Sequence, residues 1–225
     1  MLQAILFDFD GVIAETEPLH FEAFTHTLPA FDLPLSRENY FARYVGLSDY
    51  EIVKRLSIDL NRDLTPRTHR EVLDRKRTHY RETIDGGIDL IPGVGDLIRR
   101  ASRRWPLAIC SGSARSEIET ILTCADLRQC FKAIVAAEDV SVSKPDPAGY
   151  QLACANLKNT TPDLVETDCL VLEDSRAGIL AAKAAGMRVV GIRKDYGDAD
   201  SAPADRWIDS FLELTDETLA TVMQS

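Results

Sequence analysis

The sequence predicts an α/β protein: a Rossmann-like parallel-sheet core domain with an inserted helical cap domain. Three observations support this class. A short apolar run within residues 3–8 has the composition of a strand that is buried on both faces. Residues 16–85 then read as one helix after another, without a convincing strand. From Leu90 onward, short apolar runs alternate with helical segments, which is typical of a parallel sheet with crossover helices.

The order of these segments sets the domain organisation. The sheet takes its first strand from the N-terminal run and its other strands from after residue 105, so the helical block is an insertion. We therefore expect a core domain of residues 1–15 plus 88–225 and a cap domain of residues 16–87. Both connections of the cap flank the end of the first strand.

Composition argues against several classes of partner. The 225 residues include 45% hydrophobic and 28% charged side chains, as is ordinary for a globular protein with a sizeable core. The net charge of −10 argues against nucleic acid and against an anionic membrane as partners. No apolar stretch approaches the ~20 residues of a membrane span, and Asp8 interrupts the N-terminal run too early for a signal peptide. Five cysteines without a C-x-x-C pair indicate reduced thiols in a cytoplasmic protein, which we expect to be a monomer.

Two acidic residues follow the first strand. Ile5 to Phe7 are apolar, and Asp8, Asp10 and Gly11 come after them. Open α/β sheets bind ligands at the carboxyl ends of their strands, and two carboxylates placed there repel each other unless a cation joins them. A divalent cation fits, because hard cations prefer carboxylate and carbonyl oxygens. The alternative is a pair of solvated loop acids without a role, and the downstream segments argue against it.

The cap segments follow in order. Thr16 is suited to cap the first helix, because acidic residues and Pro18 occupy its first turn. An apolar stripe at helical spacing runs along that helix: Phe21, Phe24 and Leu28. The clearest later elements are helices over residues 49–57 and 66–84, followed by a flexible joint at Gly86-Gly87.

The core segments alternate between strand and helix as far as the C-terminal region. Gly186 is a good left-handed terminator for the Ala-rich helix before it. The expected elements are a helix over 93–104, a strand over 107–110, a helix over 117–123, a strand over 133–136, a helix through Ala155, a strand over 169–172, a helix over 176–185, a strand over 189–192 and an edge strand at 207–208.

Later strands also end in polar residues. Ser111 follows an apolar strand, and it either holds an anion or caps the next helix, a role for which Ser113 and Ser116 compete. Lys144 lies in a proline-fixed loop, which favours a directed side chain over an ordinary surface lysine. Glu173 and Asp174 repeat the acidic pattern after four apolar residues. Two acidic strand ends in one sheet predict a metal site.

This set of residues, in this order, resembles the haloacid dehalogenase superfamily. The resemblance covers the chain through four stretches: Ile5-Leu6-Phe7-Asp8-Phe9-Asp10-Gly11-Val12, Ile109-Cys110-Ser111-Gly112-Ser113, Ser143-Lys144-Pro145-Asp146-Pro147 and Leu172-Glu173-Asp174-Ser175. The helical insert after the first stretch resembles the small-cap group that contains β-phosphoglucomutases and phosphoglycolate-type phosphatases. Thr16 and His20 further resemble the β-phosphoglucomutase-like branch.

The resemblance implies a phosphotransfer mechanism. Asp8 would attack phosphorus and form an aspartyl-phosphate. Asp10 would protonate the leaving oxygen and then activate water. The dehalogenases of the superfamily lack an acid at the second position after the nucleophile, so the resemblance argues against dehalogenation here.

The resemblance also implies a cofactor and a phosphate cradle. Mg²⁺ would be bound by Asp8, the Asp10 carbonyl and Asp174, with Glu173 nearby. Ser111 and Lys144 would hold the transferring oxygens, Lys144 as a fixed point charge.

Substrate choice is expected to lie largely in the cap. The mutases resemble this chain in Gly46-Leu47-Ser48, but they next carry an arginine for a second phosphate, where this chain has Asp49. Lys76 interrupts an apolar helical stripe, and it either contacts substrate or packs its stem while its amine reaches water. Arg115 either supplies positive charge or is solvated. The candidate substrate-binding residues are Thr16, His20, Gly46, Lys76, Gly112, Ser113 and Arg115.

The leading hypothesis is a Mg²⁺-dependent phosphatase that acts on a small phosphorylated metabolite, a sugar phosphate above all. The alternative within enzymes is a β-phosphoglucomutase-type phosphomutase, against which an acid at Asp49 counts because it would repel a distal phosphate. A receiver domain also uses acids, a lysine and Mg²⁺, but it has no cap insert. A catalytically idle binding module would not need all the charged motif residues.

Overall fold

The structure is a computed structural model that describes residues 1–45, 47–84, 88–195 and 201–223. It divides into a core unit, Met1–Glu15 with Asp89–Ser225, and a cap unit, Thr16–Ile88. Within the described ranges, no helix combines the length and the apolar character that crossing a membrane requires.

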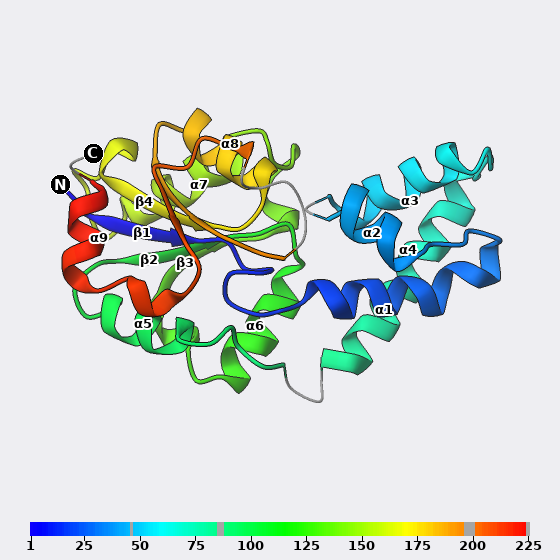
Figure 1. Cartoon of the computed structure of the whole chain (residues 1–225), viewed down its shortest axis with the longest axis horizontal. Coiled ribbons are helices and arrows are strands. Elements are labelled where there is room, and N and C mark those ends of the chain that lie inside the picture. The colour runs from blue at the N-terminus through cyan, green and yellow to red at the C-terminus, as the bar shows by residue number, and fades with distance from the viewer. Residues whose placement is uncertain (46, 85–87, 196–200, 224–225) are drawn as a thin grey trace. The chain divides into compact units, whose positions relative to one another are not determined.

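The core unit is built on a six-stranded parallel sheet in the order β3-β2-β1-β4-β5-β6 (Figure 1). This confirms the α/β class. Every residue of the central strand, β1, is buried, as the apolar run predicts. The strands are β1 (Ala4–Phe7), β2 (Leu107–Cys110), β3 (Phe131–Val135), β4 (Cys169–Glu173), β5 (Arg188–Ile192) and β6 (Arg206–Ile208).

Helices cover both faces of this sheet. In Figure 1, α7 and α8 lie on one face, while α5 and α6 lie on the other. Leu6 and Val171 from the strands share one buried apolar cluster with Tyr150 of α7 and Ile179 of α8. The helices of the core unit are α5 (Val94–Ala101), α6 (Arg115–Cys124), α7 (Ala148–Leu157), α8 (Arg176–Ala184) and α9 (Asp216–Val222).

The register of the sheet brings the polar strand ends together. Phe7 pairs with Ile109 of β2 and with Leu172 of β4. The residues that come next, Asp8 after β1 and Glu173 at the end of β4, therefore lie at the same edge. This is the edge at which open parallel sheets bind ligands.

One helix start differs from the sequence prediction. The helix expected over 117–123 begins at Arg115, and Ala114 occupies its N-cap position. The Glu117 carboxylate accepts a hydrogen bond from the Ala114 N–H at 3.4 Å. The N-cap roles considered for Ser113 and Ser116 are therefore wrong. Ala114 holds the N-cap position, and Glu117, the third residue of the helix, accepts the hydrogen bond of the Ala114 N–H.

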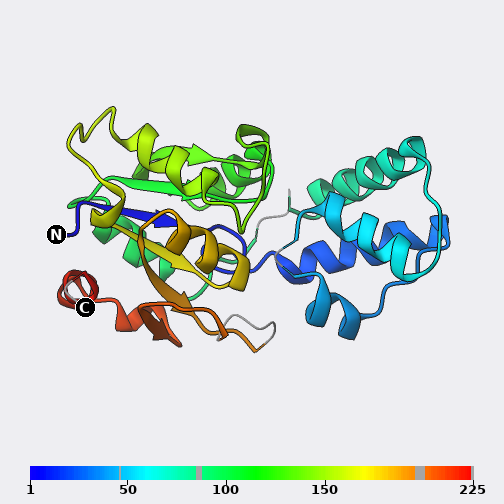
Figure 2. The ribbon, with the colours of Figure 1, turned by 90° about the horizontal axis from the view of Figure 1, so that it is seen from above.

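The cap unit contains α1 to α4, the blue to blue-green helices in Figure 2. Ser48 and Thr65 accept hydrogen bonds from the N–H groups of Glu51 and Thr68, so each stabilises a helix start. Thr16 occupies the N-cap of α1, but its side chain makes no capping hydrogen bond. Gly46 and the expected joint at Gly86-Gly87 lie outside the described residues. The helices are α1 (Glu17–Thr27), α2 (Arg37–Arg43), α3 (Asp49–Asp59) and α4 (Pro66–Ile84).

A charged residue lies in the interior of the cap unit. Lys76 belongs to the buried face of α4 and is only 1% exposed. Its Nζ donates to both carboxylate oxygens of Asp49, at 2.9 Å each, and lies 2.6 Å from His20 Nδ1. The same Nζ is 4.8 Å from the centroid of the Tyr80 ring. The interpretation of Lys76 as a packed stem with its amine in water is therefore wrong, because the amine is buried with its partners.

Asp49 is correspondingly not an uncompensated charge. Its side chain is 35% exposed, and it forms an ion pair with Lys76. Burial by itself raises the pKa of Asp49, but the Lys76 ammonium, helped by His20, outweighs burial and holds that pKa below its usual range. The sequence argument that Asp49 would repel a phosphate assumed an unpaired carboxylate, and the ion pair with Lys76 contradicts that assumption.

We expect Asp49→Ala to destabilise the cap unit, because it leaves the buried Lys76 ammonium without its carboxylate. The loss should be about 2 kcal/mol in the free energy of unfolding. This is less than the ~3–5 kcal/mol of a fully buried pair, because the Asp49 side chain is a third exposed. Urea unfolding of the full chain at pH 7 measures it. Glu71→Ala removes an exposed α4 pair with Arg75 and should cost less than ~0.5 kcal/mol.

The same ion pair predicts a pH dependence. A carboxyl whose folded-state pKa is lowered contributes stability above its unfolded pKa, and this contribution is lost as pH falls through the lowered value. The difference between the unmodified protein and Asp49→Ala should therefore shrink in acid. An equal difference at neutral pH and well below the carboxyl range would contradict the pairing.

Candidate active site

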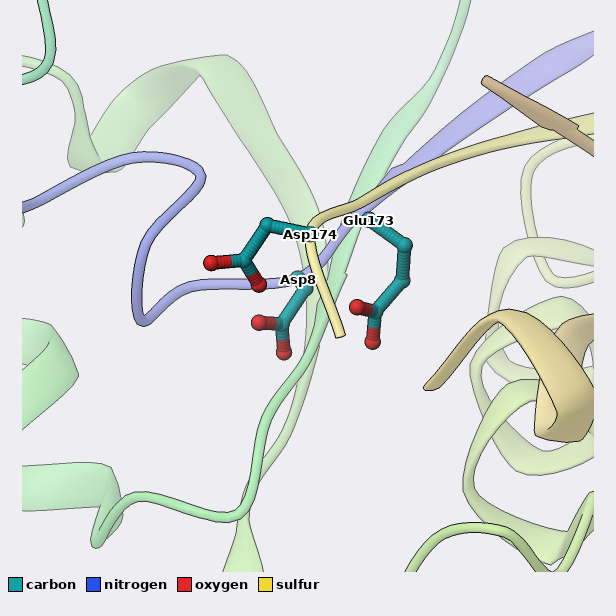
Figure 3. A group of neighbouring side chains, drawn as sticks. All are labelled: Asp8, Glu173 and Asp174. Atoms are coloured by element: carbon teal, nitrogen blue, oxygen red, sulfur yellow. The ribbon is translucent and has the colours of Figure 1, made fainter. Parts of the chain in front are cut away.

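Three carboxylates gather where β1 and β4 end. Asp8, Glu173 and Asp174 each place one oxygen within 4.8 Å of the others, and all three residues are buried (Figure 3). Gly11 permits this approach, because it has a φ of +78° and a Cβ at its position would lie 1.8 Å from Asp174 Oδ2. The metal site expected from the sequence thus corresponds to a real cluster of hard oxygen donors.

Lys144 joins two of these acids. Its Nζ lies 2.5 Å from Asp8 Oδ1 and 2.6 Å from Glu173 Oε1, and its side chain is only 16% exposed. The loop Ser143-Lys144-Pro145-Asp146-Pro147 therefore directs the lysine inward, and the alternative of an ordinary surface lysine is wrong.

Glu173 is held on both of its carboxylate oxygens. Oε1 accepts from Lys144 and from the Tyr150 hydroxyl at 3.0 Å, while Oε2 accepts from the Ser175 N–H and hydroxyl. A Cβ at Gly178 would lie 1.5 Å from Oε1, so this helix start needs a glycine to admit the carboxylate. Glu173 is thus fixed in place and in turn fixes Lys144.

Tyr150 is a site residue that the sequence analysis missed. It is fully buried on α7, and its ring centroid lies 5.1 Å from Lys144 Nζ. Its position among apolar helical residues predicts only a core side chain. The available signal was its hydroxyl, because a buried tyrosine usually needs a hydrogen-bond partner.

The charge balance of the cluster is negative. With all three carboxyls ionised, the cluster would hold two negative charges in excess of the Lys144 ammonium, in a buried place. Burial raises the pKa of Asp8 against the pull of Lys144, and Glu173 and Asp10 raise it further. Burial alone would lower the pKa of Lys144, but Asp8 and Glu173 outweigh it, so the ammonium stays charged. A hard divalent cation fits this donor set and would balance its charge.

The neighbouring thiol does not change this balance. Burial raises the pKa of Cys110, the last residue of β2, to about 12. The thiol therefore remains neutral at physiological pH.

Asp10 lies beside the serines that follow β2. Its Oδ2 accepts from Ser111 Oγ at 3.0 Å and from Ser113 Oγ at 2.6 Å. The Ser113 N–H donates to Ser111 Oγ at 2.9 Å. A Cβ at Gly112 would meet no atom within 4 Å, so open space adjoins the turn. The structure therefore brings together Asp10, Ser111 and Ser113, and Ser111 does not serve as a helix cap.

The remaining candidate residues are Arg115 of the core unit and four residues predicted for the cap. Arg115 Nη2 contacts Asp139 at 2.5 Å and the Ile134 carbonyl at 3.0 Å, so its charge is already paired. Thr16, His20 and Lys76 belong to the cap unit, and Gly46 lies outside the described residues. The cap unit also has a cleft of about 950 Å³ between α1 and α4, which none of the predicted site residues lines.

Comparison with known proteins agrees with the motifs. The model of the haloacid dehalogenase-like hydrolase family matches residues 5–192. Fructose-1-phosphate phosphatase YqaB from Escherichia coli K12 is 34% identical over 191 residues, which cover 84% of this chain and 95% of YqaB. Beta-phosphoglucomutase from Bacillus subtilis is 32% identical over 195 residues, which cover 85% of this chain and 83% of that enzyme.

A solved structure extends the similarity to three dimensions. The crystal structure of a mutant of CbbY from Rhodobacter sphaeroides, in complex with xylulose-(1,5)bisphosphate, has a TM-score of 0.83 and 32% sequence identity to this chain. The match covers 95% of this chain and 96% of CbbY. The resemblance drawn from the four motifs is thereby confirmed: the chain is an enzyme that belongs to the haloacid dehalogenase-like hydrolase family.

Proposed function

We propose that this enzyme is a Mg²⁺-dependent phosphatase that hydrolyses a small phosphorylated metabolite, a sugar phosphate, through an aspartyl-phosphate. The observation that carries the proposal is the bridge from Lys144 to Asp8 and Glu173 beside Asp174. A buried ammonium next to a carboxylate nucleophile suits a reaction in which a phosphate dianion must approach an anion. The family relatives that act on phosphorylated sugars support the substrate class.

In this proposal Asp8 is the nucleophile and Asp10 is the general acid and base. An Asp8 oxygen attacks phosphorus, and the bond from phosphorus to the sugar oxygen breaks as Asp10 delivers a proton to that oxygen. Asp10, now a carboxylate, takes a proton from the water that attacks the aspartyl-phosphate. Inorganic phosphate leaves, and both residues return to their starting states.

The remaining residues hold the phosphoryl group and the cation. Lys144 and the Ser111 hydroxyl contact the transferring oxygens, and Glu173 with Tyr150 keeps Lys144 in place. Asp8, Asp174 and the Asp10 carbonyl would bind Mg²⁺, with Glu173 beside them. When bound, the cation offsets the repulsion between the Asp8 carboxylate and the phosphate.

A β-phosphoglucomutase-type reaction is the second candidate, favoured by the 32% identity to that enzyme. A mutase must grip a second phosphate while the first is transferred. In the Asp49–Lys76 ion pair the two charges cancel, so the pair has no net positive charge with which to bind a second phosphate. This supports net hydrolysis, with Thr16, His20, Gly112 and Ser113 as proposed substrate contacts.

Replacement of the nucleophile is the first test. We expect Asp8→Asn to lower phosphate release by more than about 10³-fold, because an amide cannot attack phosphorus. Its stability should not fall much, since the change relieves a repelling charge. Asp163→Asn changes an exposed aspartate of the core unit and serves as the control. Near-normal turnover by purified Asp8→Asn would remove the assignment.

The cation gives a second test. Activity should disappear in excess EDTA and return with Mg²⁺. Asp174→Ala should weaken Mg²⁺ binding at least tenfold, about 1.4 kcal/mol, when measured by calorimetry in the absence of substrate. Full activity in EDTA, or unchanged Mg²⁺ affinity in the variant, is the result that contradicts the assignment.

Product analysis decides between hydrolysis and isomerisation. Incubation with β-glucose 1-phosphate and a trace of the bisphosphate should release phosphate faster than it forms glucose 6-phosphate, because the cap's paired charges do not retain a second phosphate. Both products can be followed in one reaction by phosphorus NMR. Isomer formation that outpaces phosphate release would establish the mutase instead.

A further inference from the structure

The Ser113 hydroxyl lies close to the proposed acid, Asp10. It lies 2.6 Å from Asp10 Oδ2, against 3.0 Å for Ser111. Ser113 is buried, and its backbone is tied on both sides. Its N–H donates to Ser111 Oγ, and its carbonyl accepts from the Ala137 N–H at 3.1 Å. Its hydroxyl therefore meets Asp10 from a fixed position.

The two serines cannot play the same part during turnover. A serine hydroxyl has one proton to donate. When the Ser111 hydroxyl donates to a phosphoryl oxygen, as the proposed function requires, it can no longer donate to Asp10. The Ser113 hydroxyl can keep its hydrogen bond to Asp10 Oδ2.

We propose that Ser113 is the positioning residue for the general acid–base: it holds Asp10 by Oδ2 so that the other carboxyl oxygen, Oδ1, carries the transferred proton. Oδ1 gives that proton to the leaving oxygen as the bond to phosphorus breaks. It then receives a proton from the attacking water, so the carboxyl is restored in each cycle. The inference rests on the proposed function, and it replaces the substrate contact proposed for Ser113 by a contact with Asp10.

Leaving-group dependence distinguishes this role from a structural one. Benzyl phosphate and 4-nitrophenyl phosphate are similar in size, but benzyl alkoxide is a strongly basic leaving group that needs a proton, whereas 4-nitrophenolate leaves as a stable anion. With enzyme in excess, the single-turnover rate of alcohol or phenol release reports transfer to Asp8. For Ser113→Ala we expect a loss of at least tenfold with benzyl phosphate and of less than threefold with 4-nitrophenyl phosphate.

Two further variants control the experiment. Ser113→Thr keeps a hydroxyl at the position and should recover most of the rate with benzyl phosphate. Ser102→Ala removes a hydroxyl that donates to the Arg99 carbonyl at the end of α5, and it should change neither rate. Half-saturating enzyme concentrations should stay within about threefold of the unmodified protein, because the substrate contacts of Lys144 and Ser111 remain.

Other outcomes overturn the inference. Equal losses with both phosphates, or no loss with either, would mean that Ser113 does not position the acid. Weaker binding with an unchanged maximal rate would make it a substrate contact only. The proposed function is judged separately by Asp8→Asn. If that variant is inactive while Ser113→Ala keeps the normal ratio of the two rates, only the inference about Ser113 fails. If the unmodified enzyme cleaves neither phosphate and no sugar phosphate, both fall.

Discussion

The contact on which the rest of the site depends is the Lys144 ammonium between Asp8 and Glu173. Carboxylates at the buried ends of neighbouring strands repel one another and are costly to desolvate. One ammonium offsets part of that cost, and the surroundings are fitted to it. The proline-bounded loop directs the lysine, Tyr150 and Ser175 hold Glu173, and glycines at 11 and 178 make room for the acids.

Much of the core could be predicted because its signals are local. The apolar run before Asp8 identifies the central strand, and the similar run before Glu173 identifies its neighbour. In a parallel sheet the ends of such strands lie at one edge, so the acidic cluster follows from pattern alone. The inward direction of Lys144 could be expected from its loop. Helix ends were less predictable: α6 begins two residues before the expected start because Glu117 supplies a capping oxygen.

What could not be predicted are pairings between segments that are distant in the sequence. Nothing near Tyr150 indicates a bond to Glu173, and nothing near Ser113 indicates one to Asp10. In the cap, Asp49 and Lys76 are 27 residues apart, and the charge of each was judged alone. Their ion pair contradicts two interpretations made from the sequence. The Lys76 amine is not in water, and Asp49 is not an isolated negative charge. Which residues pair in this way depends on where the fold places their side chains, and residue type alone does not determine it.

The central claim is that Asp8, held beside Lys144, becomes covalently phosphorylated. The stereochemistry at phosphorus tests it most directly. Two successive in-line displacements, first by Asp8 and then by water, each invert the phosphorus centre, so together they retain its configuration. A sugar phosphate made chiral with oxygen isotopes and sulfur, hydrolysed in isotopically labelled water, should therefore yield thiophosphate of retained configuration. Inversion would mean that water attacks the substrate directly, and it would contradict the account.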